Sequence, residues 1–194
     1  MIDIKIIEKE IDEAILSEDK IEGKRDAIKL VAEKLKLKSL DWSKYIFFVE
    51  GTYTRNAVIH NDAFTILVLC WAKGCKSPIH NHPCDGCFIL GLDGELEETR
   101  YEQKKNDKSL VMTERSLIRK GDITWMHDYI GYHKVSNVSE ADAVTLHIYY
   151  PPFNTCKAYN LEGEDWNCYP KFYSINGEKV EQKTEIWYIN KYYK

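Results

Sequence analysis

Three histidines offer the clearest chemistry in this chain. His80 and His82 are separated by a single residue, and His133 follows much later in the sequence. Side chains at positions i and i+2 of a strand point to the same face, so these two imidazoles can bind one metal ion together with a third imidazole from another strand. Three neutral ligands leave the charge of a divalent cation uncompensated, and we therefore expect an anionic substrate. Three imidazoles suit zinc, copper, nickel or iron, and their spacing does not choose among these metals.

A polar face is predicted on the strand that contains residues 145–149. Thr145, His147 and Tyr149 alternate with larger apolar residues, so the three polar side chains share one face. Such a face must form hydrogen bonds, either with solvent or, inside a barrel, as a relay of hydroxyl, imidazole and phenol.

Tyr53 and Arg55 form a second alternating pair. An arginine guanidinium binds a carboxylate through two parallel hydrogen bonds, so Arg55 is a candidate for binding an anionic substrate. An isolated surface arginine is the alternative interpretation. His60 and His127 lie outside both patterns, and we expect them to be surface histidines or core histidines with satisfied hydrogen bonds.

The composition restricts the class of protein. A chain of 194 residues is most simply one domain with a complete hydrophobic core. The net charge of −4 does not suggest a polyanionic partner, so nucleic-acid binding is not expected. No apolar run reaches about 18 residues, so no membrane span is expected, and residues 1–5 include charged residues that are not typical of a secretory signal. We therefore expect a cytoplasmic protein whose six cysteines are free thiols.

The first 40 residues are predicted to be helical. Apolar residues recur there at helical spacing in two runs, which Gly23 separates: Ile4, Ile7, Ile11, Ala14 and Ile15, then Ile28, Val31, Ala32 and Leu35. From Tyr45 the pattern changes to short β-branched or aromatic runs at residues 45–49 and 65–71, and these runs predict strands.

Turn residues divide the remainder of the chain into many short strands. Residues 83–86 have turn composition, Asp93-Gly94 indicates a hairpin, and residues 104–108 are a charged loop. This pattern predicts a mainly β sandwich or small barrel. We expect a single domain over residues 1–194, with a helical segment at 1–40, a β-barrel core at 45–160 and a C-terminal β extension at 161–194.

The spacing of the histidines resembles the first cupin motif. Residues 74–94 match its pattern of glycines and histidines, with Cys87 at the position of the usual glutamate. Residues 121–137 resemble the second motif less closely, because His127 stands at its proline and His133 lies one residue late. The resemblance implies a cupin double-stranded β-helix (jelly-roll) barrel, here with N-terminal helices and with the metal ion inside.

Several segments between residues 45 and 160 resemble segments of the cysteine dioxygenase family of the eukaryotic type and occur in the same order along the sequence. They are Tyr53-Thr-Arg-Asn56, Leu69-Cys-Trp71, Ile79-His-Asn-His82, Cys87-Phe88, Leu96-x-Glu98-Thr99, and Leu146-His-x-Tyr149 running into Pro151-Pro-Phe-x-Thr-Cys156. The resemblance implies a monomeric oxidoreductase of cysteine catabolism and taurine biosynthesis. Its reaction would oxidise L-cysteine with O2 to cysteine sulfinic acid.

The same resemblance implies roles for individual residues. Arg55, with Tyr53 and Tyr149, would bind the substrate carboxylate. Tyr149 would also form a thioether with Cys87, which makes a protein-derived cofactor. The polar face at residues 145–149 corresponds to a Ser-His-Tyr relay, with threonine in place of serine. Non-haem Fe(II) would be held by three ligands: His80, His82 and His133. The substrate would bind to this iron through its thiolate and amine.

Cysteine at position 87 in place of glutamate is consistent with this chemistry. A thiolate is the form of sulfur that binds a metal, so an anionic substrate would supply the charge that a carboxylate ligand usually provides. Addition of two oxygen atoms to sulfur gives the sulfinic state, which is not normally reversed.

Further matches concern the surroundings of the site. The resemblance implies that Trp71 lies in the pocket wall, that Cys156 lies near the pocket, and that the peptide before Pro151 is cis. Gly86 departs from the family, since many relatives carry histidine there.

Other functions are compatible with parts of the pattern. A dioxygenase for 3-mercaptopropionate or cysteamine is one, but bacterial mercaptopropionate enzymes usually have glutamine and glycine in place of Arg55 and Cys87, and cysteamine has no carboxylate. A metal-binding cupin without turnover is another. Cys84-x-x-Cys87 could be a redox dithiol or half of a zinc site, but the sequence contains no second pair with this spacing.

Overall fold

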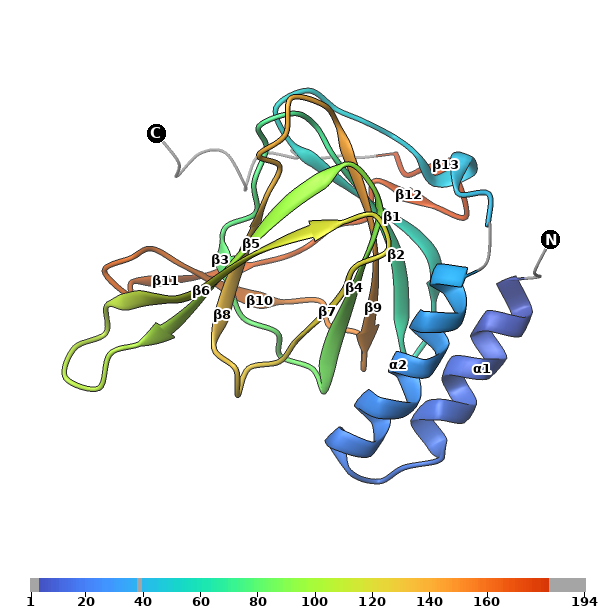
Figure 1. Ribbon diagram of the computed structural model, residues 1–194, viewed down its shortest axis with the longest axis horizontal. Coiled ribbons are helices and arrows are strands. Elements are labelled where there is room, and N and C mark those ends of the chain that lie inside the picture. Colours follow the sequence, from blue (N-terminus) through green and yellow to red (C-terminus); the bar gives the residue numbers. More distant parts are fainter. Residues whose placement is uncertain (1–3, 38–39, 182–194) are drawn as a thin grey trace.

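The computed structural model describes residues 4–37 and 40–181, which form two helices beside a two-sheet β-barrel (Figure 1). The helices are α1 (Ile4–Leu16) and α2 (Ile21–Leu37), followed by a short 3-10 helix (Ser43–Tyr45). The strands are β1 (Tyr53–His60), β2 (Thr65–Trp71), β3 (Ile79–His80), β4 (Gly86–Asp93), β5 (Glu95–Gln103), β6 (Leu110–Arg119), β7 (Ile123–Met126), β8 (Tyr132–Ser136), β9 (Ala143–Tyr150), β10 (Cys156–Tyr159), β11 (Asp165–Cys168), β12 (Ser174–Ile175) and β13 (Glu178–Lys179).

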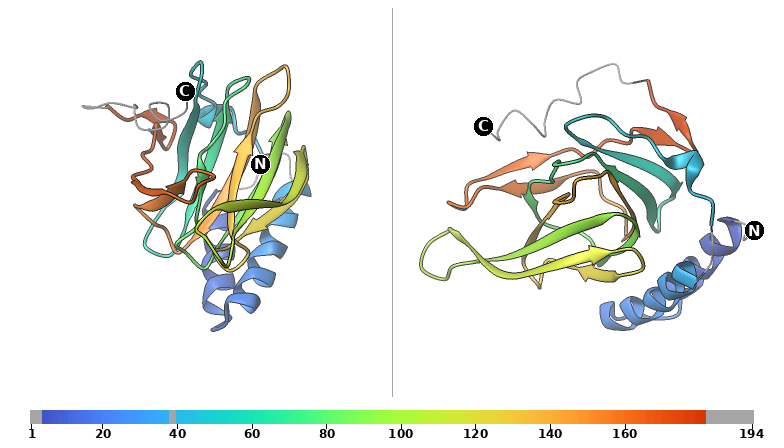
Figure 2. Two further views of the ribbon diagram at one scale, coloured as in Figure 1. Left: turned by 90° about the vertical axis from the view of Figure 1, so that its left-hand side faces the viewer. Right: turned by 45° about the horizontal axis from the view of Figure 1, so that its top comes forward.

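Two sheets curve around the interior of the molecule (Figure 2, right). One sheet has the strand order β13-β12-β1-β2-β9-β4-β7, and the other has the order β11-β10-β3-β8-β5-β6. The expected mainly β barrel with N-terminal helices is therefore confirmed. Residues 182–194 of the expected C-terminal β extension lie outside the described residues.

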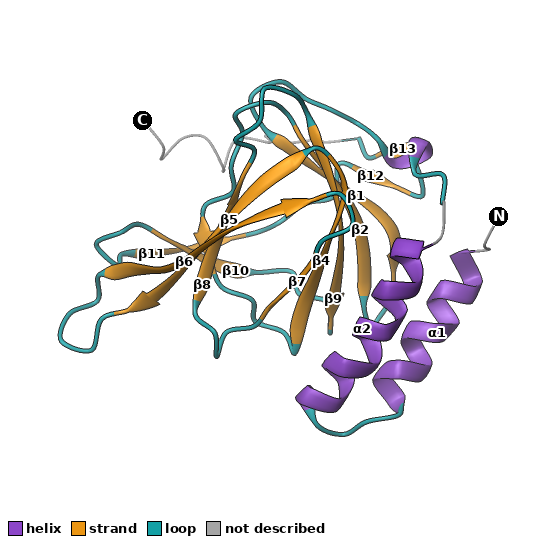
Figure 3. Cartoon of the chain, in the orientation of Figure 1, coloured by secondary structure: helices purple, strands orange, loops and turns teal. Residues whose placement is uncertain are grey.

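The two helices lie side by side against the outer face of the seven-stranded sheet (Figure 3). Ile11 of α1 and Ile28 of α2 are fully buried. They belong to one apolar cluster with Val68, Phe88 and Leu146, which point outward from β2, β4 and β9. Because side chains alternate along a strand, the residues between these face the barrel interior and form a second cluster there.

Strand β9 shows this alternation clearly. All of its residues are buried. Leu146, Ile148 and Tyr150 pack in the cluster beneath the helices, whereas Tyr149 belongs to the interior cluster. The polar residues of this strand therefore face the inside of the barrel, on the face opposite its aliphatic residues.

The prediction that Gly23 separates two helical runs is wrong. The interruption lies at residues 17–20, and Gly23 is in the first turn of α2. A Cβ atom at Gly23 would lie 2.6 Å from a carboxylate oxygen of Glu18. Glu18 is exposed and its side chain can turn away, so Gly23 simply lies within the helix and does not break it.

The prediction of a strand at residues 45–49 is also wrong. Tyr45 ends the 3-10 helix, and residues 46–49 have no regular structure. The amide of Phe47 donates a hydrogen bond to the sulfur of Cys70, and its carbonyl accepts one from the hydroxyl of Thr54. Side chains thus satisfy the backbone of a β-prone segment that the sequence pattern assigned to a sheet.

Asp93-Gly94 forms a tight turn, but the predicted hairpin is wrong. β4 ends at Asp93 and β5 begins at Glu95, yet the two strands belong to different sheets. Gly94 has a φ of 73°, and a Cβ atom there would lie 2.7 Å from the Cβ of Ala143. The turn carries the chain from one sheet to the other, where β5 pairs with β8, the strand that contains His133.

Candidate metal centre

Two neighbouring strands bring the three histidines together. His80 ends β3 and is the direct partner of His133 in β8, and His82 follows two residues after His80. Potential ligand atoms of the three rings all lie within 4.8 Å of one another. The Nε2 atoms of His80 and His133 are 3.3 Å apart. The displacement of His133 by one residue from the motif therefore does not keep it out of the cluster.

The donor set fits a metal ion. His82 is almost fully buried, and its Nδ1 has no hydrogen-bond partner among the described residues. Burial, and then the neighbouring His133 ring, lowers the pKa of His80 to about 3 and the pKa of His82 well below its ordinary value. Both rings are therefore neutral near pH 7, and the neutral imidazole is the form that binds metals.

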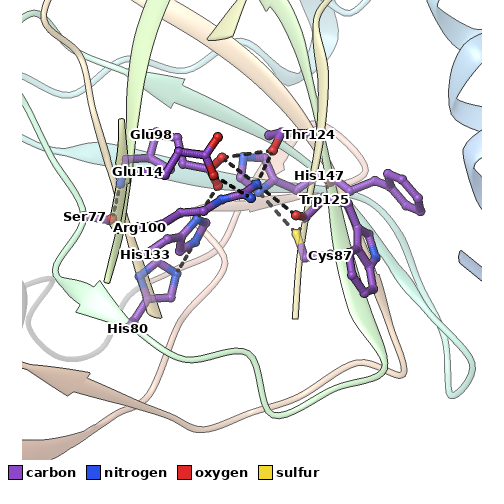
Figure 4. A network of polar contacts seen from close by, with 12 residues as sticks. Ser77, His80, Cys87, Glu98, Arg100, Glu114, Thr124, Trp125, His133 and His147 are labelled. Carbon is purple, nitrogen blue, oxygen red and sulfur yellow. Dashed lines mark hydrogen bonds and ion pairs between the residues drawn. The ribbon is translucent and has the colours of Figure 1, made fainter. Parts of the chain in front are cut away.

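Glu98 on β5 holds His133 from the side away from the cluster (Figure 4). Its Oε1 lies 2.7 Å from Nδ1 of His133, while its Oε2 accepts hydrogen bonds from Arg100 at 3.1 Å and Thr124 at 2.9 Å. Burial opposes ionisation of this carboxyl group, but the hydrogen bond from His133 and the charge of Arg100 lower its pKa overall. A carboxylate in this position fixes the ring so that Nε2 points toward the other histidines.

Glu98 is absent from the site residues that the sequence predicts, although one matching segment contains it. A usable signal is present, because Leu96, Glu98 and Arg100 alternate along one strand. Leu96 and Glu98 are both buried. A carboxylate on the same face as a core leucine needs a buried partner, so the alternation indicates an internal polar network.

Arg55 on β1 presents its positive charge to the same region. Its guanidinium carbon lies 5.5 Å from the ring centre of Tyr149, and the charge of Arg55 opposes the rise that burial causes in the pKa of this tyrosine. After burial, the charge of Arg55 is the largest cause of the low pKa of His147. The Nε of Arg55 is buried and has no partner among the described residues. A cation with an unpaired donor beside neutral imidazoles is suited to bind an anion.

Tyr53 lies on the same strand and is held by stacking. Its ring centre is 4.6 Å from that of Trp71, at an interplanar angle of 24°. Burial raises the pKa of Tyr53, while the charge of Arg55 opposes this change. The phenol therefore stays protonated and can donate a hydrogen bond.

The polar face of β9 forms a continuous hydrogen-bonded chain. Trp71 donates its indole N–H to Oγ1 of Thr145 at 2.9 Å, and Oγ1 lies 2.9 Å from Nε2 of His147. The other ring nitrogen of His147, Nδ1, lies 3.1 Å from the hydroxyl of Tyr149. Either neutral tautomer of the imidazole satisfies both contacts, because the ring accepts from one hydroxyl while it donates to the other.

Cys87 and Tyr149 are direct partners on the adjacent strands β4 and β9. The Cys87 sulfur is fully buried and lies 3.8 Å from Nδ1 of His147. Burial raises the pKa of the Cys87 thiol well above its ordinary value, although a hydrogen bond with Tyr149 opposes the shift. The structure thus brings together the two residues that the family resemblance pairs in a thioether.

Two further sequence features, the peptide before Pro151 and Gly86, can be compared with the structure. The Tyr150–Pro151 peptide is cis, as the resemblance implies. Gly86 stands where a Cβ atom would lie 2.4 Å from the indole nitrogen of Trp125, so this indole fills the space that a side chain at position 86 would need.

His60 and His127 are not part of the histidine cluster. Nδ1 of His60 pairs with the hydroxyl of Thr65, and Nδ1 of His127 accepts a hydrogen bond from the amide of Tyr129. Both are satisfied histidines, as expected. Cys84 directs its thiol to the carbonyl of Gly86, and burial raises its pKa to about 12, so it is a poor nucleophile near pH 7.

Comparison with known proteins agrees with this geometry. The family model described as cysteine dioxygenase type I matches residues 11–162. The chain is 37% identical over 139 residues to cysteine dioxygenase type 1 of Rattus norvegicus, covering 70% of this chain and 69% of that protein. It is 32% identical over 151 residues to the Danio rerio protein of the same name, covering 75% of each.

Among solved structures, the protein TT1209 from Thermus thermophilus superimposes with a TM-score of 0.48 at 18% identity. The superposition covers 58% of this chain and 95% of that one.

Proposed function

The chain belongs to the cysteine dioxygenase type I family, and from this premise we propose that it oxidises L-cysteine with O2 to cysteine sulfinic acid. The observation that carries the proposal is that the charge of Arg55 acts on a cluster of three convergent imidazoles. A substrate that offers a thiolate to a metal and a carboxylate to arginine matches both groups. This activity belongs to cysteine catabolism.

The proposed metal is Fe(II), bound by the imidazoles of His80, His82 and His133. A ferrous ion would supply the redox chemistry that activation of O2 requires. The protein itself contributes three neutral ligands, one of which is fixed by the buried carboxylate of Glu98. Because this set adds no negative charge next to the metal, it favours an anionic substrate.

Substrate orientation is assigned to Arg55, Tyr53 and Tyr149. The guanidinium would bind the carboxylate through two hydrogen bonds, and the Nε of Arg55, which has no partner within residues 4–37 and 40–181, is an additional donor. Tyr53 is held in place by its stack on Trp71 and remains protonated, so it would donate to the same carboxylate. These contacts would fix the carbon chain of the substrate and limit where its sulfur can lie.

Proton handling is assigned to Thr145, His147 and Tyr149. The hydroxyl of Tyr149 would hold or release a proton, and Nδ1 of His147 lies at hydrogen-bond distance to receive it. Burial lowers the pKa of His147 well below its ordinary value, so the imidazole returns to the neutral form after each transfer. Its Nε2–H would donate to Oγ1 of Thr145, which would keep Nδ1 free to accept from Tyr149. The methyl group that distinguishes threonine from serine leaves this contact intact.

We also propose the thioether between Cys87 and Tyr149, supported by their cross-strand pairing. Its formation would join Sγ to the ring carbon beside the hydroxyl, with loss of the S–H and one ring C–H hydrogen. The two electrons and two protons would go to O2, which is a substrate of the proposed reaction. After turnover, mass analysis of tryptic peptides should find residues 77–100, which contain Cys87, joined to residues 135–157, which contain Tyr149, with a loss of two hydrogens. Absence of this linkage after many turnovers would contradict the crosslink.

Oxygen uptake tests the main proposal. Iron-loaded protein should consume O2 with L-cysteine and release cysteine sulfinic acid. Cysteamine and 3-mercaptopropionate are matched probes, because the first lacks the carboxylate and the second lacks the amine. Uptake with 3-mercaptopropionate but none with cysteine would overturn the substrate assignment. No uptake with any of the three thiols would favour a metal-binding protein without turnover.

The proposal includes a monomer in the cytoplasm. No helix within residues 4–37 and 40–181 is long and apolar enough to cross a membrane. Sedimentation of the purified protein should give the mass of one chain, and fractionation of cells should recover it with the cytoplasmic proteins.

A further inference from the structure

Two of the six cysteines face each other on a hairpin outside the proposed catalytic relay. Cys156 begins β10, Cys168 ends β11, and the two residues are direct partners in this antiparallel pair. Directly opposed residues in such a pair have Cα atoms about 4.5–5.5 Å apart, which lies within the range of about 4.4–6.8 Å found for disulfides. The backbone therefore places these two sulfur atoms within bonding reach.

The side chains of the pair already interact. A hydrogen-bonding interaction with the side chain of Cys156 is the largest cause of a lowered pKa at Cys168. A hydrogen bond from the side chain of Trp166 also lowers it, while burial opposes the shift. The same contact with Cys168, and then burial, raises the pKa of Cys156. The pair therefore has one thiolate-forming member and one member that stays protonated.

Access distinguishes the two members in the same way. β11 is an edge strand of the six-stranded sheet, where it pairs with β10 (Figure 1). Cys168 is partly exposed on it, whereas Cys156 is buried. A small molecule from solvent can thus reach the more acidic sulfur, and the thiolate is the nucleophilic form.

The other close cysteine pair lacks this combination. Burial raises the pKa of Cys84 to about 12 and raises that of Cys87 well above its ordinary value. Neither thiol therefore ionises readily near pH 7. Cys84 is partly exposed like Cys168, so it is a matched comparison that differs in acidity rather than in access.

The pair also lies next to the proposed substrate site. The charge of Arg55 acts on Cys156, and both cysteines act on the ionisation of Tyr53. β10 in turn pairs with β3, where Ala158 is the direct partner of His80. A covalent change on this hairpin would occur beside the residues that bind the substrate and hold one metal ligand.

We propose that Cys156 and Cys168 form a reactive dithiol that closes into a cross-strand disulfide on reaction with small-molecule disulfides. The Cys168 thiolate attacks one sulfur of the reagent, so a mixed disulfide forms and one thiol leaves. Cys156 then loses its proton and attacks the sulfur of Cys168, which releases the second thiol. The protein loses two electrons and two protons, and the reagent is reduced to two thiols.

Exchange with 2-hydroxyethyl disulfide tests this inference. Reduced protein is incubated with the reagent, free thiols are alkylated, and tryptic peptides are weighed before and after reduction. Peptide 135–157 contains only Cys156 and peptide 158–171 contains only Cys168, so their linkage identifies the bond. We expect these peptides joined with a loss of two hydrogens and separated again by reduction. A thioether at Cys87 survives reduction, so the two linkages are distinguishable.

Three variants assign the order of events. The reaction of Cys156→Ser with the reagent should stop at a mixed disulfide on Cys168. In Cys168→Ser, Cys156 should react with the reagent at least tenfold more slowly than in the unmodified chain. Cys84→Ser, the matched control, should form the linkage within twofold of the original rate. Far-UV circular dichroism verifies the fold of each variant. No linkage in the unmodified chain, or faster labelling of Cys84 than of Cys168, would overturn the proposal.

Discussion

At the scale of single residues, Arg55 is the side chain whose proposed role depends most directly on charge. Arg55→Ala should raise KM for cysteine about ten- to hundredfold, because a charge-assisted hydrogen bond contributes about 1.5–3 kcal/mol. Steady-state oxygen uptake measures the effect. Arg55→Lys keeps the charge but not the planar guanidinium, so its KM should lie between that of the unmodified protein and that of Arg55→Ala. An unchanged KM in Arg55→Ala would mean that the guanidinium does not bind the substrate.

Glu98 is the residue through which the protein acts on its own metal ligand. Glu98→Gln replaces the carboxylate that accepts the hydrogen bond from His133 with a neutral amide. The affinity for Fe(II) should fall about 10–100-fold, the usual cost of losing such a partner. Anaerobic competition with a chromophoric chelator measures this affinity without reference to activity.

Glu97→Gln is the matched control for this change. Glu97 precedes Glu98 on the same strand, but its carboxylate pairs with Arg115 on the opposite face. The control should keep the affinity of the unmodified protein. Equal affinities in the two variants would show that the contact between Glu98 and His133 does not support metal binding.

At the scale of elements, the alternation of residue types predicted which face of a strand is buried better than it predicted where strands begin and end. Residues 65–71 form strand β2 as expected, because every residue of that run is buried. Residues 45–49 have equally β-prone side chains, but the Phe47 backbone bonds to side chains instead of a neighbouring strand. Strand pairing depends on which backbone lies alongside, and local composition does not contain that information.

The helical pair shows how a pattern in the sequence becomes an energy of packing. Ile28 is fully buried between α2 and the sheet, whereas Leu30 on the same helix is 66% exposed. Ile28→Ala should lower the free energy of unfolding by about 2–5 kcal/mol, because it removes buried methyl groups and leaves a cavity. Leu30→Ala should change it by about 0.5 kcal/mol or less. Urea denaturation measures both, and similar losses in the two variants would contradict this packing.

At the scale of the whole molecule, the metal centre results from pairing between distant segments. The sequence predicted the three histidines through their spacing and the family resemblance. It did not predict the direct pairing of His80 with His133, because the register between β3 and β8 depends on the closed barrel. The alternation of residues marks Glu98 as a buried carboxylate but does not indicate its partner, since its contact with His133 forms only when the Asp93-Gly94 turn carries the chain into the second sheet.

Burial of histidines inside the barrel also makes the metal-free protein sensitive to acid. Burial is the largest cause of the low pKa values of His82 and His147, whereas in the unfolded chain a histidine titrates near pH 6.5. Below pH 6.5 the unfolded state therefore binds more protons, and the free energy of unfolding falls as the pH is lowered. Each such histidine contributes up to about 1.4 kcal/mol per pH unit.

Urea denaturation of chelator-treated protein at pH 7.5, 6.5 and 5.5 measures this dependence. His147→Gln should reduce the slope below pH 6.5, because it removes one group that must stay neutral in the folded barrel. His60→Gln is the comparison at an exposed histidine outside the barrel interior. The slope is the diagnostic quantity, because loss of the contacts with Thr145 and Tyr149 lowers stability at every pH. A slope in His147→Gln equal to that of the unmodified protein would show that this histidine is not held neutral by the fold.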